Sequence, residues 1–598
     1  MIKRTLFPSL GHVFKSFELL YQSNPVLTRV KIGVTLVQSI LPVLQLTILK
    51  QLIDALTFLF DQNRATDIHD FWKWGVMFVI VTLIWRILSI VLESVDELLR
   101  QDLMNSIYAK VHAQSVDLGM SYFDNPAYFD TLHRAQQESP SQPMDLMNDL
   151  FNGFSAFITL LGIFSVILGM NSGVGVLLLI LGIPLLMARL GRSKQMFDWR
   201  KNNTTSFRKS HYLDRLITSR ESAKEVRIFN QGAYLRSSFL VVRNALYEST
   251  VRIIRRRSLM ETFAVLFEIG ALVGVLVLLF NQVELSTITL GGFVMIFEAF
   301  RKGQTTVLTL VVSLASFYSR KLNLVHLFDF LSLPKQMDSG DLQEEGSSRE
   351  EKVRLHQEFP QRITSLEFEQ VSFQYPDTKE LAVDRVSFKI EIGKIALLKG
   401  LNGSGKSTII KLISRLYEPT SGRILINGID IQTMSKGDYR QHIGVVLQDF
   451  MQYNFTLRDN IQLGRKDMPN KWRDKLADFT GVNKLLGKLP LGYNSLLGKM
   501  FTGGRELSMG QWQSIALMRA LWTNPPIWLL DEPTGWMDVE KENHFLTILP
   551  ELAKDRLVVL SHHAPFVLLN KALDLQVIDL QESVSQSNLS FDQDRGGE

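Results

Sequence analysis

The residues best suited to do chemistry are the eight at 400–407, which read Gly-Leu-Asn-Gly-Ser-Gly-Lys-Ser. Residues 395–398 before them are apolar and predict a strand, and residues 408–413 predict a helix. Glycines let backbone N–H groups wrap around phosphates, and the start of a helix adds positive potential. We expect Lys406 to reach the β- and γ-phosphates and the Ser407 hydroxyl to bind Mg²⁺. A glycine-rich turn without a ligand is the alternative, but the Lys-Ser pair between strand and helix favours a phosphate-binding loop.

A second motif at 526–532 reads Pro-Ile-Trp-Leu-Leu-Asp-Glu and predicts a buried strand that ends in two carboxylates. Asp531 is expected to hold Mg²⁺. Glu532 would then lie near the γ-phosphate and could polarise the attacking water as a general base. An Asp-Glu pair alone would indicate an ordinary charged strand end. Together with the phosphate-binding loop, it predicts an ATPase with ATP and Mg²⁺ as its cofactors.

Six apolar stretches precede these motifs, each near the ~20 residues of helix that a bilayer requires. A large water-soluble protein with buried helices is the alternative, but residues 174–187 are apolar on every face, whereas a surface helix would carry a polar stripe. The sequence therefore predicts six membrane-spanning helices, at residues 30–52, 72–92, 150–170, 173–190, 261–280 and 290–317.

The distribution of basic residues predicts the orientation in the membrane. The connections at 61–70, 171–172 and 281–289 contain one cation between them, Arg64. The connections at 94–149 and 191–259 are long and rich in Lys and Arg. The positive-inside bias puts these long connections, the ATPase and both termini in the cytoplasm. Their helical periodicity predicts that they extend the membrane helices.

The composition of the remaining residues predicts where the linker and the second domain begin and end. A charged stretch at 337–352 predicts a linker, and alternating strands and helices from about 363 to 580 predict an α/β domain with a largely parallel sheet. The fold class is thus an all-α polytopic membrane domain followed by an α/β P-loop NTPase domain. The expected domains are 1–336 (transmembrane), 337–361 (linker), 362–585 (nucleotide-binding) and 586–598 (disordered tail). The absence of cysteine excludes disulfides and thiolate metal sites.

Residues 507–511, Leu-Ser-Met-Gly-Gln, resemble the signature motif of the ABC transporter family, which usually reads Leu-Ser-Gly-Gly-Gln. The resemblance implies that Ser508, Gly510 and Gln511 face the ATP bound by a second cassette, so that two cassettes enclose two ATP molecules. Met509 departs from the usual glycine but leaves the serine hydroxyl and Gly510 in place.

Other positions of the chain match the family's motifs individually. Tyr375 resembles the aromatic that stacks on adenine, and Gln448 resembles the glutamine that senses Mg²⁺. His562 resembles the histidine at the γ-phosphate and joins Glu532 as a catalytic residue. Asp538 matches the D-loop aspartate, although Thr-Gly-Trp-Met-Asp at 534–538 departs from the usual sequence. The resemblance thus implies an ATP site formed by Tyr375, Gly400, Asn402, Gly403, Ser404, Gly405, Lys406, Ser407, Thr408, Gln448, Ser508, Gly510 and Gln511, with Ser407, Gln448 and Asp531 as metal ligands.

The fusion of six helices to one cassette resembles exporters, and residues 122–130 and 224–229 resemble loops that hold their coupling helices. These stretches, with 501–506, resemble bacterial exporters of lantibiotic-like modified peptides. An amphipathic peptide is therefore the expected cargo, and lipids or drugs are the alternative, as is an ATP-gated membrane regulator that does not pump. The expected partners are the bilayer and a second copy of the chain, with a heterodimer as the alternative and no nucleic acid. A bacterial inner membrane is the expected location.

A polar stripe on the last predicted membrane helix indicates a cargo pathway. The residues of this stripe recur at three- and four-residue spacing and therefore share one face of a helix. They are Glu298, Lys302, Thr305, Thr309, Ser313 and Ser316. Charges within a membrane span usually face a bundle interior or a wet cavity. One alternative is an ion pair between Glu298 and Lys302, four residues apart, and another is packing of these polar residues against a partner subunit. The predicted cavity residues are Gln38, Gln45, Glu268, Glu298, Lys302, Thr305 and Thr309, with Ser313 and Ser316 continuing the stripe.

Overall fold

The chain forms two compact units, one within residues 1–115 and 130–333 and the other within 116–129 and 334–598. The structure is a computed structural model. It describes residues 11–62, 68–124, 141–170, 202–284, 288–334, 357–376, 378–401, 403–562 and 575–580, with short stretches between 132 and 199. The predicted linker at 337–352, the tail and Asn402 lie outside the described residues.

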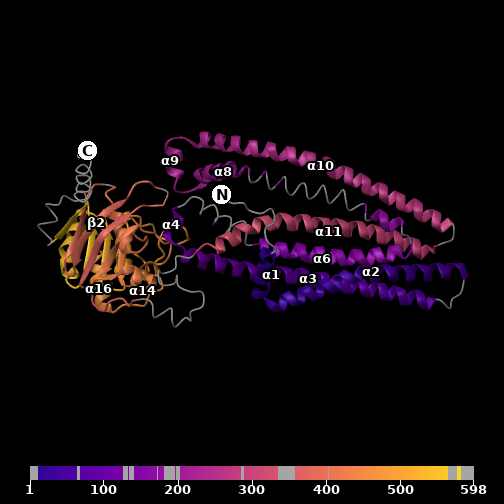
Figure 1. Ribbon diagram of the computed structural model, residues 1–598, viewed down its shortest axis with the longest axis horizontal. Coiled ribbons are helices and arrows are strands. Elements are labelled where there is room, and N and C mark those ends of the chain that lie inside the picture. Colours follow the sequence, from indigo (N-terminus) through magenta and orange to yellow (C-terminus); the bar gives the residue numbers. More distant parts are fainter. Residues whose placement is uncertain are drawn as a thin grey trace, which may run out of the picture. The chain divides into compact units, whose positions relative to one another are not determined.

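The first unit is entirely helical in its described part, and long helices dominate it (Figure 1). Among the described residues, four segments are long and apolar enough to cross a membrane: Pro25–Phe60, Ile68–Asp117, Gln142–Leu168 and Val265–Val283. They coincide with the first, second, third and fifth predicted spans. The predicted span at 173–190 falls mostly outside the described residues, and that at 290–317 lies within a long helix. The helices of this unit are α1 (Gly11–Ser23), α2 (Pro25–Gln62), α3 (Ile68–Asp117), α6 (Gln142–Leu168), α8 (Thr204–Thr218), α9 (Ala223–Ile228), α10 (Gly232–Glu284) and α11 (Leu290–Leu331).

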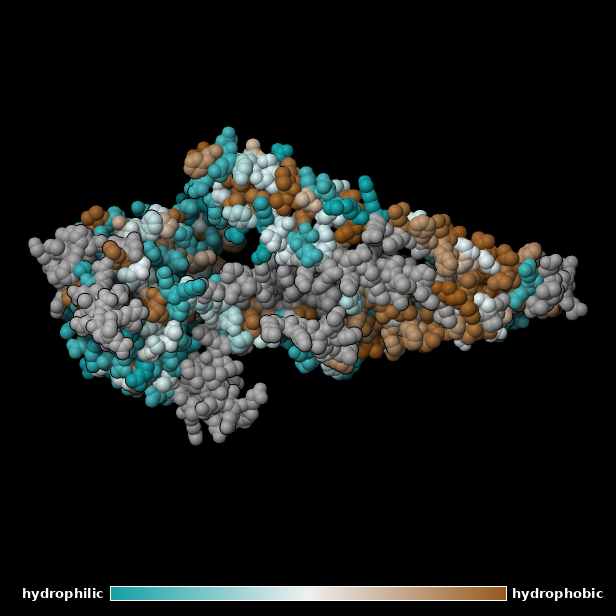
Figure 2. All heavy atoms as spheres, turned by 45° about the horizontal axis from the view of Figure 1, so that its top comes forward, coloured by the Kyte–Doolittle hydropathy of each residue, from teal (hydrophilic) through white to brown (hydrophobic). Residues whose placement is uncertain are grey.

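These helices present apolar side chains outward. Val79, Phe263 and Phe280 are 64%, 70% and 66% exposed. Figure 2 shows hydrophobic residues covering one half of the length of the long helices. Water would penalise so large an apolar surface, whereas lipid does not. The helical domain is therefore embedded in the membrane.

A polar network of partly buried charged side chains, with Lys31 fully buried, joins α2, α3, α6 and α11. The Lys31 ammonium, 2% exposed, donates to Asp96 and to Asn148. Asp145 accepts from both Arg100 and Arg320 at 2.8 Å, and Arg320 also contacts Asp149 at 2.8 Å. Buried charges are tolerated where each is paired and hydrogen-bonded, and removal of one partner is costly. The network therefore helps to fix which helices of this unit pack together. Its members are Lys31, Asp96, Arg100, Asp145, Asn148, Asp149 and Arg320.

The second unit contains two sheets. The parallel one has the strand order β6-β7-β8-β3-β9, which confirms the predicted parallel sheet. The other is antiparallel, with the order β2-β1-β4-β5, and was not anticipated from the sequence. The strands are β1 (Ser365–Phe373), β2 (Val383–Glu391), β3 (Ile395–Lys399), β4 (Ser421–Ile426), β5 (Ile429–Asp430), β6 (Ile443–Val446), β7 (Ile527–Asp531), β8 (Leu557–Ser561) and β9 (Leu575–Asp579).

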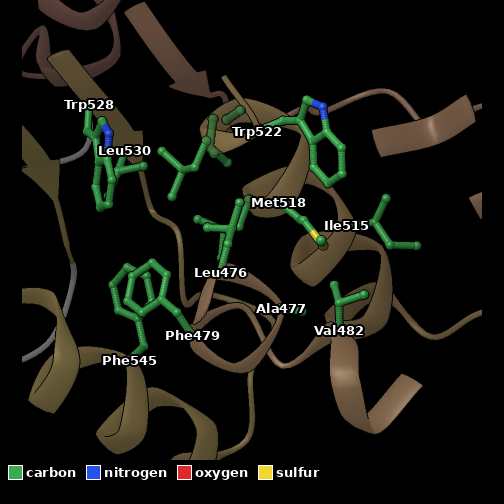
Figure 3. Close-up of a cluster of buried hydrophobic side chains, with 14 of the residues drawn as sticks. Leu476, Ala477, Phe479, Val482, Ile515, Met518, Trp522, Trp528, Leu530 and Phe545 are labelled. Carbon is green, nitrogen blue, oxygen red and sulfur yellow. The ribbon is translucent and has the colours of Figure 1, made fainter. Parts of the chain in front are cut away.

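Helices pack on these sheets around a large apolar core. Figure 3 shows Phe479 beside Phe545, with Trp528 and Leu530 of β7 nearby. The Phe479 and Phe545 rings stack with centroids 4.8 Å apart. This core anchors the strand that carries the two carboxylates. The helices of the unit are α4 (Met120–Phe123), α13 (Lys406–Ile413), α14 (Lys436–Gln441), α15 (Leu457–Gln462), α16 (Asn470–Phe479), α17 (Val482–Leu486), α18 (Met509–Leu521) and α19 (Val539–Ala553).

Helix α4 belongs to this second unit although it follows α3 in the chain. The Tyr417 hydroxyl donates to the Asp124 carboxylate directly after α4. Burial, together with that carboxylate, raises the pKa of the Tyr417 hydroxyl, so it remains a protonated donor. The predicted coupling segment at 122–130 begins here, and its part from 125 to 130 lies outside the described residues.

Candidate functional site

The phosphate-binding loop lies between β3 and α13, as the sequence predicts. Gly405 precedes the helix with φ +94°, and a Cβ there would lie 2.6 Å from the Ala382 carbonyl oxygen, so only glycine fits. The first N–H groups of a helix lack intrahelical acceptors and can bind an anion. The Ser404 hydroxyl, in the same loop, is buried with no hydrogen-bond partner among the described residues. The loop thus offers several hydrogen-bond donors, the first backbone N–H groups of α13 and the Ser404 hydroxyl, to a phosphate group.

Lys406 is the buried cation of this loop. It is 8% exposed, and its ammonium donates to the carbonyl oxygens of Gly400 and Leu401, both at 2.9 Å. The side chain therefore folds along the loop that a phosphate would enter. A phosphate oxygen offers the same ammonium a charged acceptor, which forms a stronger hydrogen bond than a neutral carbonyl.

The two predicted carboxylates lie at the end of β7. Asp531 is 3% exposed and accepts from the Ser561 hydroxyl at 2.6 Å. The Glu532 backbone N–H donates to the Ser561 carbonyl at 3.2 Å and lies 3.0 Å from its hydroxyl. Glu532 has φ +49°, a left-handed conformation that is unusual for glutamate. Strand β8, through Ser561, thus helps to hold both carboxylates in place.

The side chains of Gln448 and Glu532, which follow the neighbouring strands β6 and β7, contact each other. The Gln448 side-chain amide donates to Glu532 Oε2 at 3.1 Å, although 84 residues separate them in the chain. The pairing leaves the amide oxygen of Gln448 available as a ligand. The structure thus brings the predicted metal ligand and the predicted base into direct contact.

His562 lies in a group that the sequence did not reveal. Its Nε2 lies 2.8 Å from the Thr534 hydroxyl and 2.9 Å from Glu542 Oε1. The imidazole is 6% exposed, so these contacts are sheltered from water. Glu542 on α19 had no motif to mark it. The histidine is therefore held by the segment that follows Glu532.

The signature residues begin helix α18. Ser508 and Gln511 form a capping box, in which the Ser508 hydroxyl accepts from the Gln511 N–H and the Gln511 side chain accepts from the Ser508 N–H. Met509 is 38% exposed, and its sulfur accepts from Gln452. Gln511 thus fixes the start of its own helix. Its predicted role toward ATP remains a prediction.

Tyr375 and Asp538 lie at two edges of the site. The Tyr375 hydroxyl is 3.1 Å from that of Thr408 on α13, which places the ring beside the phosphate-binding loop. The Asp538 carboxylate caps α19 by accepting from the Lys541 N–H at 2.9 Å. That backbone hydrogen bond holds the pKa of Asp538 below its usual value.

The predicted cavity residues of the helical unit are only partly brought together. Lys302 donates to Gln45 at 3.0 Å and thus links α11 to α2. Glu298 pairs with Arg301, so among the described residues its ion pair is not with Lys302, as the alternative to the cavity required. Gln38 and Gln45 donate to Ser89 and Thr82 of α3, while Gln304 donates to the Glu268 carbonyl oxygen at 3.4 Å. Thr305 and Thr309 are exposed, Ser316 is half-buried and Ser313 is buried.

The residues predicted to bind Mg²⁺ suit that ion. Ser407, Gln448 and Asp531 all offer oxygen atoms, which are the ligands that Mg²⁺ prefers. Mg²⁺ usually takes few protein ligands and completes its shell with water and phosphate.

Comparison with known proteins agrees with this geometry. A family model described as ABC transporter matches residues 383–535, which include the phosphate-binding loop, the signature residues and both carboxylates. The chain therefore contains, at residues 383–535, an ATP-binding domain of the ABC transporter type. It combines the ATP-binding domain of that family with an exporter-type membrane domain.

The relatives and the fold extend over nearly the whole chain. The subtilin transport ATP-binding protein SpaT of Bacillus subtilis is 27% identical over 92% of this chain and 87% of its own length. The nisin transport ATP-binding protein NisT of Lactococcus lactis subsp. lactis is 27% identical over 82% of this chain and 80% of its own. A bacterial Atm1-family ABC exporter solved with ATP bound has the same fold, with a TM-score of 0.72 at 21% identity over 93% of this chain and 94% of its own. The chain is thus an integral membrane protein with an ABC-type ATP-binding domain and the fold of an ABC exporter.

Proposed function

We propose that this chain hydrolyses ATP with Mg²⁺ and uses the energy to export an amphipathic or modified peptide from the cytoplasm. The observation that supports this most is the convergence of Gln448, Glu532 and Ser561 at the carboxyl end of β7, in the same parallel sheet as β3, which leads into the phosphate-binding loop. Glu532 acts as general base toward water, and Asp531 with Ser407 and Gln448 holds the metal. Two copies of the chain form the working unit, and both cassettes are cytoplasmic.

The peptide assignment rests on the relatives of nearly full length. SpaT and NisT are named for the transport of subtilin and nisin, and each aligns with at least 80% of both chains. A lipid is the second candidate cargo, because the lipid A-core flippase of Haemophilus influenzae is 32% identical over 50% of this chain and 48% of its own length. The longer alignments favour the peptide.

A transport assay with inverted membrane vesicles tests this function. ATP added outside such vesicles reaches only cassettes that lie on the cytoplasmic face. We expect uptake of an amphipathic modified peptide, such as nisin precursor, against its gradient, with Mg²⁺ and ATP both required. Fluorescent lipid translocation is measured in the same vesicles. Uptake that stops at equal concentrations would indicate a gate, and lipid movement without peptide uptake would favour the lipid.

The stripe on α11 gives a separate prediction about cargo. Thr309 is exposed and Lys302 is half-buried within the predicted membrane span at 290–317, where a charge is costly unless it serves an aqueous cavity or a ligand. Reversing that charge changes the attraction for a charged cargo. We expect Lys302→Glu with Thr309→Leu to change peptide-stimulated ATPase by roughly tenfold, corresponding to ~1.4 kcal/mol of cargo binding, with little change in basal ATPase.

The matched control is Thr262→Leu, because Thr262 is an exposed threonine on α10 whose hydroxyl bonds only within its own helix. It should leave peptide stimulation unchanged. An unaltered cargo response in the Lys302→Glu, Thr309→Leu protein would mean that the stripe packs against protein and that cargo passes elsewhere.

A further inference from the structure

The signature helix touches the segment after Glu532 through its backbone. A Cβ on Gly510 would lie 2.4 Å from the Trp536 carbonyl oxygen, closer than any side chain permits. Helix α18 and the turn at 532–537 are therefore in direct contact. A movement of one must be accommodated by the other, because packed interiors deform little.

Gln513, one turn along α18, bridges this contact with its side chain. Its amide N–H donates to the Glu532 carbonyl oxygen at 2.9 Å. Its amide oxygen accepts from the Trp536 backbone N–H at 3.0 Å. The residue is 2% exposed, so neither bond competes with water. One side chain therefore satisfies two backbone groups of the turn that follows the base.

The turn needs such support because its first residue is strained. Glu532 has φ +49°, which costs energy for a residue with a side chain and persists only where the surroundings hold it. On one side Ser561 accepts from the Glu532 N–H. On the other side Gln513 donates to the carbonyl of the same residue. The peptide groups on both sides of the Glu532 Cα are thus held by buried partners.

We propose that Gln513 is a positioning residue that fixes the backbone of Glu532, and with it the direction of the carboxylate toward water. The proposal rests on the proposed function, in which Glu532 is the base. The Gln513 side chain is buried and bonds to backbone groups of Glu532 and Trp536, so its removal should affect the hydrolytic step and not ATP affinity. A base displaced by ~1 Å can lose about 10²-fold in rate.

The test compares two replacements of the same shape. Gln513→Met removes both hydrogen bonds, and we expect kcat to fall by about 10- to 100-fold with KM for ATP within about twofold. Gln513→Glu keeps an acceptor for Trp536 but loses the donor to Glu532 while it is ionised. Burial favours its protonated form, which can donate again. The ratio of its kcat to that of the unsubstituted protein should therefore rise as the pH is lowered.

A double-mutant cycle distinguishes an effect of Gln513 on the position of Glu532 from a general disturbance of the structure. If Gln513 acts through Glu532, Gln513→Met should lower the residual ATPase of Glu532→Gln by much less than it lowers that of the unsubstituted protein. Thr480→Val is the control, because it removes one buried hydrogen bond, from Thr480 to the Leu476 carbonyl oxygen, in the same core. It should lower thermal stability while kcat stays unchanged.

Several outcomes would overturn the proposal. They are a normal kcat in Gln513→Met, a loss of ATP affinity in parallel with kcat, additive effects in the cycle, and failure of both variants to fold. These outcomes differ from failure of the proposed function itself. That failure would appear as absent Mg²⁺-dependent ATPase in the unsubstituted protein, or as normal turnover in Glu532→Gln.

Discussion

Glu532→Gln is expected to lower ATP turnover by roughly 10²–10⁴-fold while ATP binding is retained. The amide has the shape of the carboxylate, and its oxygen can still accept from the Gln448 side chain, as Glu532 Oε2 does at 3.1 Å. The hydrogen bonds of the Glu532 backbone, which donates to Ser561 and accepts from Gln513, do not involve the substituted atoms. Only the capacity to take a proton from water is lost, which raises the barrier by about 3 to 5 kcal/mol.

Phosphate release in the steady state measures this loss, and a shift in thermal unfolding with added MgATP measures binding. A ligand that binds the folded protein raises its stability in proportion to ln(1 + [L]/Kd), so the shift should equal that of the unsubstituted protein. Glu540→Gln is the matched control, since that exposed carboxylate on α19 pairs with Lys484 at 3.4 Å. It should hydrolyse ATP normally. Normal turnover in Glu532→Gln would remove Glu532 from the role of base.

The sequence predicted those parts of the site that local pattern determines. Asp531 and Glu532 follow an apolar strand, and Lys406 lies between a strand and a helix. In a parallel sheet the carboxyl ends of all strands meet at one edge. Strands β3, β7 and β8 do share one parallel sheet, which places these residues at a common edge. The period of the apolar residues and the position of the motifs were sufficient for this prediction.

Residues that act through tertiary contacts could not be predicted. Ser561, Gln513 and Glu542 are ordinary polar residues in sequence, and their roles depend on which strand or helix lies beside them. The same holds for Lys31 and Asp96, which pair across 65 residues of chain. Periodicity describes one element at a time, so it cannot show which elements become neighbours.

The structural role of Gln511, by contrast, could have been predicted from the sequence. Ser at 508 and Gln at 511 have the spacing of a capping box, and the structure shows both of its hydrogen bonds. The resemblance to a known motif implies, in addition, a contact of Gln511 with ATP. Capping and ATP contact are compatible, since the cap fixes the direction in which the first N–H groups of α18 point.

Lys406→Ala is expected to weaken ATP binding by at least about 10²-fold. A hydrogen bond to a charged group contributes ~1.5–3 kcal/mol, and an ammonium between two phosphates makes more than one. In the unsubstituted protein the Lys406 ammonium donates to the carbonyl oxygens of Gly400 and Leu401 at 2.9 Å. The substitution removes both of these hydrogen bonds as well. The loop therefore loses its cation together with the two hydrogen bonds that the ammonium donates to the loop backbone.

The thermal shift with MgATP separates this variant from Glu532→Gln. The shift should vanish in Lys406→Ala and persist in Glu532→Gln, because one substitution acts on binding and the other on the chemical step. Lys399→Ala, directly before the loop, is the control. Its ammonium is exposed and pairs with Asp579 at 2.9 Å, and such surface pairs contribute ~0–1 kcal/mol. Lys406→Met keeps the apolar stem packed if the alanine variant unfolds. An unchanged shift in Lys406→Met would mean that the backbone N–H groups of the loop hold the phosphates without the lysine.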